Sequence, residues 1–211
     1  LLVAAWAIGG PSATTDSDPT ETVSGYSFTE ARRTRTFWIF CAIQFLFLPS
    51  LATIPLHIVV HGMDLGMTAT VAAALVSTMA LASVLARLAV GSFFDRVGGK
   101  GALILCLVPL LASLLALLVV NTHNSLFAVI VVYGFAHGGL FTVMSPVVAE
   151  YFGLKAHGAL FGSIIFFGAI SGSVSPVLTG YIFDTTGSYS MAFNFLFAMA
   201  LSGLILTLVL P

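Results

Sequence analysis

The chain contains six apolar stretches of about 20 residues each, separated by short polar links, and this pattern constrains its fold more than any other feature. A helix of that length crosses the hydrocarbon core of a bilayer and satisfies its own backbone hydrogen bonds there. Overall, 59% of the residues are hydrophobic and 7% are charged, against about 25% charged in soluble domains. The sequence therefore predicts an all-α integral membrane protein. Its expected spans are 36–60, 69–94, 102–120, 126–149, 159–183 and 191–210.

The residues before the first span fall into two parts. Residues 1–8, "LLVAAWAI", are apolar but too few to cross a bilayer, and we interpret them as the tail of a truncated transmembrane helix. Residues 9–35 are polar and begin with a stretch rich in Gly, Pro, Ser and Thr, which is typical of a loop. Residues 36–211 form the expected six-helix transmembrane domain.

The basic residues outside the spans all lie on one side of the expected membrane. They precede span one, follow span two and follow span four, and the positive-inside rule makes that side cytoplasmic. We therefore expect 9–35 to be a cytoplasmic loop of a multi-pass protein in a bacterial inner (plasma) membrane. The six basic residues concerned are Arg32, Arg33, Arg35, Arg96, Lys100 and Lys155.

Two similar segments end the second and fifth spans. The segment "GSFFDRVG" begins at Gly91 and "GYIFDTTG" begins at Gly180, and the two share Gly, Phe, Asp and Gly at matching positions. Because the segments fall on opposite faces of the membrane, they indicate a 3+3 inverted repeat. Such repeats occur in secondary transporters, whose substrate sites lie near the bilayer midplane.

Arg87 is the basic residue that lies inside a span. It precedes Asp95 by eight residues, about 12 Å along a helix, and so lies close to the midplane of a core about 30 Å thick. A charge at that depth costs at least about 2.5–3.5 kcal/mol. Three roles would explain it: binding a substrate carboxylate in a bidentate way, an internal ion pair, or snorkelling to the cytoplasmic interface.

Polar side chains concentrate in spans one, two, four and five, whereas spans three and six are nearly bare. Polar groups in a membrane normally face the bundle interior or a wet cavity, so we expect four helices to line a substrate site. Besides Arg87, the candidates for this site are Gln44, Ser83, Tyr133 and His137. His137 changes charge near neutral pH and could sense or carry a coupled proton, with a packing histidine as the alternative.

The segment "GSFFDRVGGK" resembles the signature Gly-x-x-x-Asp-Arg-x-Gly-Arg-[Arg/Lys] of the major facilitator superfamily, with a departure at Gly99. The resemblance implies the C-terminal six-helix half of a twelve-helix transporter, which works with the N-terminal half of the same protein. "LHIVVHGMDLGMTAT" and "LARLAVGSFFDRVG" are similar to the bacterial monocarboxylate and oxalate/formate porter group, where an arginine matching Arg87 contacts the substrate carboxylate. Animal monocarboxylate carriers have an aspartate at the position of Ser83. Oxalate porters have a second cation in the eleventh helix, which span five lacks.

Two further groups of residues are candidates for roles in the transport cycle. In the family that the chain resembles, the loop after span two latches the inner face, so gating is expected of Asp95, Arg96, Lys100 and Glu150; ordinary topogenic charge is the alternative. In span five, small residues and a proline recur every four positions, which predicts close helix packing or a flexing helix beside the substrate path. These residues are Gly168, Gly172, Pro176 and Gly180.

The leading hypothesis is therefore a secondary transporter of a small organic anion, a monocarboxylate, with possible coupling to protons. The alternative is a major facilitator transporter of an uncharged substrate, a sugar or a drug, with Arg87 in an internal ion pair. No enzyme is expected, because the chain lacks the His-Glu-x-x-His and Gly-x-Ser-x-Gly patterns. We also expect no cofactor, no metal at His57 and His61, and no nucleic-acid partner, since the net charge is -1.

Overall fold

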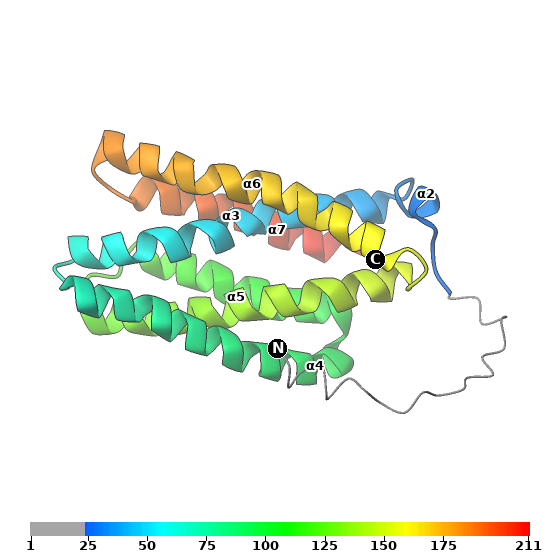
Figure 1. The fold of residues 1–211 in the computed structure, drawn as a ribbon, viewed down its shortest axis with the longest axis horizontal. Helices are drawn as coiled ribbons and strands as arrows, with labels where there is room; N and C mark the ends of the chain where they lie inside the picture. The colour runs from blue at the N-terminus through cyan, green and yellow to red at the C-terminus, as the bar shows by residue number, and fades with distance from the viewer. Residues whose placement is uncertain (1–23) are drawn as a thin grey trace, which may run out of the picture.

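A computed structural model of the chain describes residues 24–211, so the expectation for residues 1–8 and for the first part of the 9–35 loop falls outside the described residues. One short helix precedes five long ones, which pack into a bundle (Figure 1). The described part of the chain is all-α, as its apolar stretches predicted. The helices are α2 (Phe28–Ala31), α3 (Arg35–Asp64), α4 (Ala69–Leu117), α5 (His123–Phe152), α6 (His157–Thr186) and α7 (Ser190–Val209).

Helix α4 comprises two of the expected spans, and the chain turns between them within the link that the sequence predicted. It runs for 49 residues, and its backbone leaves the helical conformation at Gly98, where φ is 68° and ψ is 171°. A straight helix of that length would extend about 74 Å, more than twice the thickness of a hydrocarbon core. The break at Gly98 lets the chain reverse, so that the two arms of α4 run along the bundle in opposite directions (Figure 1).

All five long helices in residues 24–211 are long and apolar enough to cross a membrane. Helix α4 supplies two spans and each of the other four long helices supplies one, which accounts for the six spans expected from the sequence. The four helices other than α4 match one span each, but α3, α5 and α6 have 30 residues and extend beyond the predicted limits. Threonine caps begin α3, α4 and α5, where the side-chain oxygens of Thr34, Thr68 and Thr122 accept hydrogen bonds from backbone N–H groups of the first turn.

The links between helices meet at two opposite ends of the bundle. At one end, the Lys100 ammonium donates to the carbonyl of Leu208, 2.9 Å away, near the end of α7. At the other end, Nε2 of His123 lies 3.1 Å from the carbonyl oxygen of Leu65. These contacts confirm that alternate links share a side. The six basic residues outside the spans all belong to the end that holds Lys100.

The segment before α3 is joined to the loop between α5 and α6. Gly25 and Gly153 form an antiparallel bridge, in which the Tyr26 N–H donates to the carbonyl of Phe152 at 2.8 Å. Both glycines have positive φ, 138° at Gly25 and 76° at Gly153. A Cβ on Gly153 would lie 2.5 Å from the Cα of Gly25, so the close approach of the two backbones requires glycine.

Two helix pairs form the centre of the bundle. Helix α5 packs along α4, and α6 packs along α3, with α7 covering α3 and α4 from the other side. Gly138 of α5 faces the backbone of Ser83 in α4 so closely that a Cβ would overlap the Ser83 carbonyl oxygen. Gly168 of α6 faces Gln44 of α3. Lipid supplies no hydrophobic driving force between helices, so the helices are held together by close packing. Glycine makes this packing possible because it lets a helix approach its neighbour closely.

Candidate functional site

Arg87 lies on the first arm of α4, and its side chain is exposed. Its guanidinium carbon stands 5.9 Å from the centre of the Phe141 ring in α5. A guanidinium at this distance is attracted to the negative face of the ring. Within residues 24–211 the guanidinium has no ion-pair partner, so a cation near the middle of the span keeps its hydrogen-bond donors free.

Ser83 and His137 lie beside Arg87. Ser83 is one helical turn before Arg87 on α4, and its Oγ is 3.4 Å from Nδ1 of His137 on α5. The His137 ring is 5.0 Å from the Phe141 ring, centre to centre. Two residues on α4 thus face two on α5, each pair spaced four apart, so that both pairs share a helical face. This arrangement combines a fixed cation, a hydroxyl and an imidazole.

Tyr133 lies one turn before His137 on α5, but its hydroxyl is directed elsewhere. Its side chain is fully buried, and the hydroxyl donates to the backbone carbonyl of Ser50 in α3 at 2.9 Å. The Tyr133 hydroxyl is therefore used inside the protein and does not face Arg87. It connects α5 to α3 behind the His137 ring, which lies 5.9 Å away.

Gln44 lies on α3 and is 2% exposed. Its Oε1 atom is buried and has no hydrogen-bond partner in the described part of the chain. The side chain lines a small cavity of about 40 Å³ together with apolar residues of α3, α5 and α6, including Phe141 and Phe161. Gln44 and Arg87 therefore both border Phe141, although they come from different helices.

Phe141 was not among the residues selected from the sequence, yet it connects the predicted ones. It contacts Arg87 and His137, and it lines the cavity that holds Gln44. The available signal was its spacing, four residues after His137 on the same helical face. The sequence does not reveal how α5 is aligned against α4, and that alignment places the ring under Arg87.

The four predicted gating residues separate into two pairs. The Glu150 carboxylate accepts a hydrogen bond from the Gly99 N–H at 2.8 Å, at the start of the second arm of α4. The Lys100 ammonium binds carbonyls at the end of α7. Asp95 and Arg96 are exposed, and Asp95 borders a 210 Å³ cavity between the first arm of α4 and α5. Glu150 and Lys100 thus hold helix ends, whereas Asp95 and Arg96 have exposed side chains.

The small residues of span five lie on the face of α6 that contacts α3. The Leu48 side chain is 3.2 Å from where a Cβ on Gly172 would be, and His57 lies near both Gly180 and the Pro176 carbonyl. Pro176 cannot donate to the carbonyl of Gly172, and the Ser175 hydroxyl donates to that oxygen instead at 3.3 Å. The serine hydroxyl thus satisfies the carbonyl that the proline leaves free.

His57 and His61 contact an aromatic residue in the link between α6 and α7. Nδ1 of His57 is 3.3 Å from the Tyr189 hydroxyl, and the His61 ring packs edge-on against the Tyr189 ring. Burial, with the nearby carboxylates of Asp64 and Asp184, raises the pKa of Tyr189, so its hydroxyl stays protonated and can donate. No group of three His, Cys, Asp or Glu side chains suited to a metal ion occurs in residues 24–211.

A comparison with known families gives a match over almost all of the described chain. The family model described as Major Facilitator Superfamily matches residues 36–211. The chain belongs to this superfamily. Its members are membrane transporters, in agreement with the apolar helices, and its signature is the motif that the segment starting at Gly91 resembles.

Several curated relatives carry names that include a substrate class. Monocarboxylate transporter 7 of Homo sapiens is 33% identical over 180 residues, which is 83% of this chain and 33% of the relative. Monocarboxylate transporter 13 of Rattus norvegicus is 33% identical over 156 residues, or 72% of this chain and 36% of the relative. An uncharacterized transporter of Bacillus subtilis, YycB, is 30% identical over 76% of the chain and 40% of its own length. The chain thus spans about a third of the length of these relatives.

A solved structure supports the fold independently of the sequence relatives. The superfamily transporter FucP, crystallised in the outward conformation, superposes with a TM-score of 0.72 at 18% sequence identity. The match covers 88% of this chain and 45% of FucP. At that identity the likeness establishes the major facilitator fold alone.

The departure from the superfamily signature at Gly99 has a structural reason in this chain. A Cβ at Gly99 would lie 2.9 Å from Oε2 of Glu150 and 3.1 Å from a methyl carbon of Val147. The arginine of the usual signature would therefore push the Glu150 carboxylate away from the start of the second arm of α4. Glycine at this position lets the Glu150 carboxylate cap that arm directly.

Proposed function

We propose that this chain forms part of a secondary active transporter that moves a small organic anion, a monocarboxylate, across the membrane by alternating access. The observation that carries the proposal is the free guanidinium of Arg87 near the middle of a span. Its position above Phe141 leaves its hydrogen-bond donors available to a ligand. A guanidinium binds a carboxylate through two parallel hydrogen bonds, which an ammonium cannot do.

The surroundings of Arg87 suit a small anion with an apolar part. The carboxylate would bind Arg87, and the exposed Phe141 ring would contact the carbon chain. Ser83 and His137 supply polar groups on one side, and the unpartnered Gln44 amide lies beyond Phe141. The monocarboxylate transporters among the relatives support this substrate class, because each aligns with most of the chain.

Coupling to protons would depend on His137. It is the titratable group next to Arg87, and Ser83 occupies the position of the aspartate found in animal monocarboxylate carriers. An imidazole can gain a proton when the Arg87 charge is neutralised by a substrate anion, because repulsion between the two cations then falls. Uptake of the anion and of the proton would thus favour each other.

We further propose that the chain is the C-terminal half of a twelve-helix protein and that an N-terminal half completes the cavity. The chain covers 45% of FucP, and the side chain of Arg87 is exposed. Two observations support a 3+3 inverted repeat. The segments beginning at Gly91 and Gly180 end at opposite ends of the bundle, and the repeat would exchange the α3–α6 pair with the α4–α5 pair.

Gating is proposed for Asp95 and Arg96, which lie at the basic end of the bundle with exposed side chains. In this scheme they form and break contacts with the N-terminal half during the cycle. Glu150 and Lys100 would keep the helix ends in place during that motion. The basic end would face the cytoplasm, following the positive-inside rule, and a bacterial inner membrane remains the proposed location.

The proposed substrate site can be tested by chemical protection. In a protein whose other cysteines are replaced, Ser83→Cys should be alkylated more slowly when a small monocarboxylate is present. Ser92→Cys, about two and a half turns farther along the same helix and exposed, serves as the control whose rate should not change. If neutral sugars protect the cysteine at position 83 and carboxylates do not, the uncharged-substrate alternative holds, with Arg87 in an internal ion pair.

A further inference from the structure

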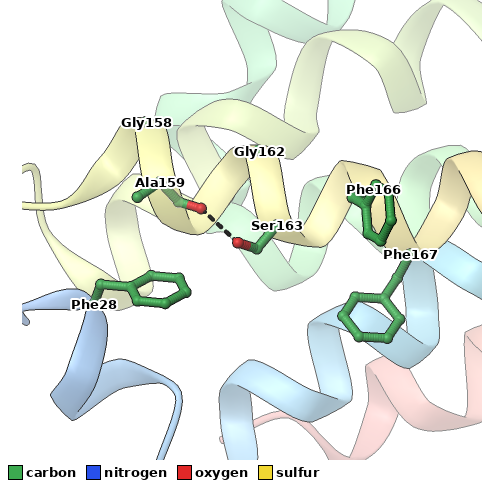
Figure 2. A pocket seen from close by; sticks show the side chains of 7 residues that line it. All are labelled: Phe28, Gly158, Ala159, Gly162, Ser163, Phe166 and Phe167. Atoms are coloured by element: carbon green, nitrogen blue, oxygen red, sulfur yellow. Dashed lines mark hydrogen bonds between the residues drawn. The ribbon is translucent and has the colours of Figure 1, made fainter.

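A groove lies away from Arg87, at the basic end of the bundle. It has a volume of about 460 Å³ and is lined by Phe28 of α2 and by the first turns of α6. Figure 2 shows the Phe28 ring beside the start of α6, with Phe166 and Phe167 farther along that helix. A Cβ on Gly158 or Gly162 would meet nothing within 4 Å, so the groove is open along its glycine side.

The lining of the groove leaves no polar side chain in need of a partner. Ser163 is its hydroxyl-bearing residue, and its Oγ donates to the Ala159 carbonyl within the same helix at 2.8 Å (Figure 2). The walls are aromatic, and the remaining positions are glycine and alanine. Such a surface fits a hydrocarbon chain and gives a polar solute nothing to bind.

The groove extends from the level of the lipid headgroups into the hydrocarbon core. It starts at the first turn of α6, which begins at His157, and ends at Phe167, about 15 Å along the helix. Trp38 and Tyr26 are exposed at the same end of the bundle, at 54% and 46%. Trp and Tyr are enriched at membrane interfaces, so they mark the headgroup level here.

Two basic residues lie close in the chain to the shallow end of the groove. Lys155 is exposed and lies just before the start of α6. Arg32 is exposed at the end of α2, where its carbonyl accepts a hydrogen bond from the Trp38 indole at 3.0 Å. The Trp38 ring in turn packs edge-on against Phe167, with ring centres 5.8 Å apart. Arg32 thus follows α2 directly and Lys155 precedes α6 by two residues, next to the two helices that border the groove.

One carboxylate lies near this rim. Glu30 is on α2, and hydrogen bonds from the hydroxyl and N–H of Ser27, helped by the charge of Lys155, lower its pKa. Arg33 and Arg35 follow on the same side of the bundle, so basic groups exceed the single carboxylate. The combination of a cationic rim and an apolar trough matches the two parts of an anionic phospholipid.

We propose that this groove binds an anionic phospholipid from the leaflet at the basic end of the bundle. The headgroup phosphate lies between Lys155 and Arg32, and one acyl chain lies over Gly158 and Gly162 toward Phe166. The site is separate from the proposed substrate site and does not depend on it. A bound lipid would link α2 to α6 at the loop that the Gly25–Gly153 bridge also holds.

Trp38 provides a direct readout of the site. In the full chain, with every other tryptophan replaced by phenylalanine, brominated phosphatidylglycerol should quench Trp38 fluorescence at a lower mole fraction than brominated phosphatidylcholine with the same acyl chains. We expect a preference of about fivefold for each basic residue that contacts the headgroup. Lys155→Gln and Arg32→Gln should each reduce this preference. Lys100→Gln should not, because Lys100 binds the end of α7.

The acyl trough has its own test. Gly162→Leu should weaken quenching by both lipids, and Gly162→Ala, which adds one methyl group to open space, should leave it unchanged. Equal quenching by the two lipids in the parent protein would overturn the proposal. A photoreactive residue at Phe166 gives a further check: crosslinks to lipid support the site, and crosslinks to another polypeptide segment would assign the groove to a helix and overturn it.

Discussion

The α4–α5 pair and the α3–α6 pair use glycine in the same way but treat their polar groups differently. In both pairs a glycine lets one backbone approach the neighbouring helix, Gly138 against Ser83 in the first and Gly168 against Gln44 in the second. The two pairs also occupy equivalent places in the proposed repeat. The difference between them lies in what the polar side chains near the middle of each pair contact.

Between α3 and α6, Thr53 and Ser175 satisfy each other, whereas Gln44 Oε1 has no partner in the described part of the chain. The Thr53 hydroxyl donates to Oγ of Ser175 at 2.9 Å, and the Ser175 hydroxyl shares its proton between the carbonyls of Pro49, at 3.2 Å, and Gly172, at 3.3 Å. Between α4 and α5, Ser83 and His137 are 3.4 Å apart, and Arg87 has an aromatic ring as its neighbour. Since an unpaired charge in a membrane is more costly than an unpaired neutral group, we propose that the α4–α5 pair, which holds Arg87, is the place for a ligand and that the α3–α6 pair serves mainly structure.

The largest effect is expected where α5 touches α4 most closely. Gly138→Ala should destabilise the protein by about 3 kcal/mol or more, because the new Cβ would overlap the Ser83 carbonyl and the backbone must shift. Thermal unfolding in detergent measures this. Gly91→Ala on α4 is the matched control, since nothing lies within 4 Å of its Cβ position. Equal stability of the two variants would contradict the close approach.

The next effect concerns function at the α4–α5 pair. Arg87→Gln should lower monocarboxylate uptake by about 100-fold, because a hydrogen-bonded charge is lost. Arg87→Lys should lower it by about tenfold, since the charge remains without the planar fork. Uptake into proteoliposomes of the full chain, corrected for inserted protein, is the measurement. Normal uptake by Arg87→Gln would show that the α4–α5 pair does not bind the substrate through Arg87.

A smaller effect is expected at the α3–α6 pair. Thr53→Val removes the hydroxyl that donates to Ser175, and the stability loss should be about 0.6 kcal/mol, with about 1.7 kcal/mol as the upper range for such bonds in membranes. The ratio of uptake between two monocarboxylates should stay unchanged. A shift in that ratio, absent from a Ser92→Ala control, would show that the α3–α6 pair also contacts the substrate.

Local sequence patterns were sufficient for several of these features. Apolar stretches located the membrane helices, and the link residues indicated which ends share a side. The small residues of span five predicted close helix packing, and Gly168 and Gly172 do face α3. These inferences depend on spacing within one segment, which the chain itself specifies.

Features that depend on the alignment of distant segments were not accessible in this way. The sequence indicated a link near Gly98, where the chain does turn, but Asp, Arg and Gly did not specify that the turn would be so tight that two helical arms meet almost without a loop. The position of Phe141 under Arg87 depends on how α5 is aligned along α4. Tyr133 was grouped with the substrate residues, but its hydroxyl reaches α3, which no spacing within α5 reveals.

The bridge between Gly25 and Gly153 has a consequence for biosynthesis. Gly25 leaves the ribosome long before Gly153, so this contact cannot form while α3, α4 and α5 are still being inserted. The segment around Tyr26 therefore stays undocked at the membrane surface until α5 is in place. Its docking marks the end of the insertion of α3, α4 and α5. A tag fused near Ser24 would obstruct this late event while leaving the insertion of the first helices unaffected.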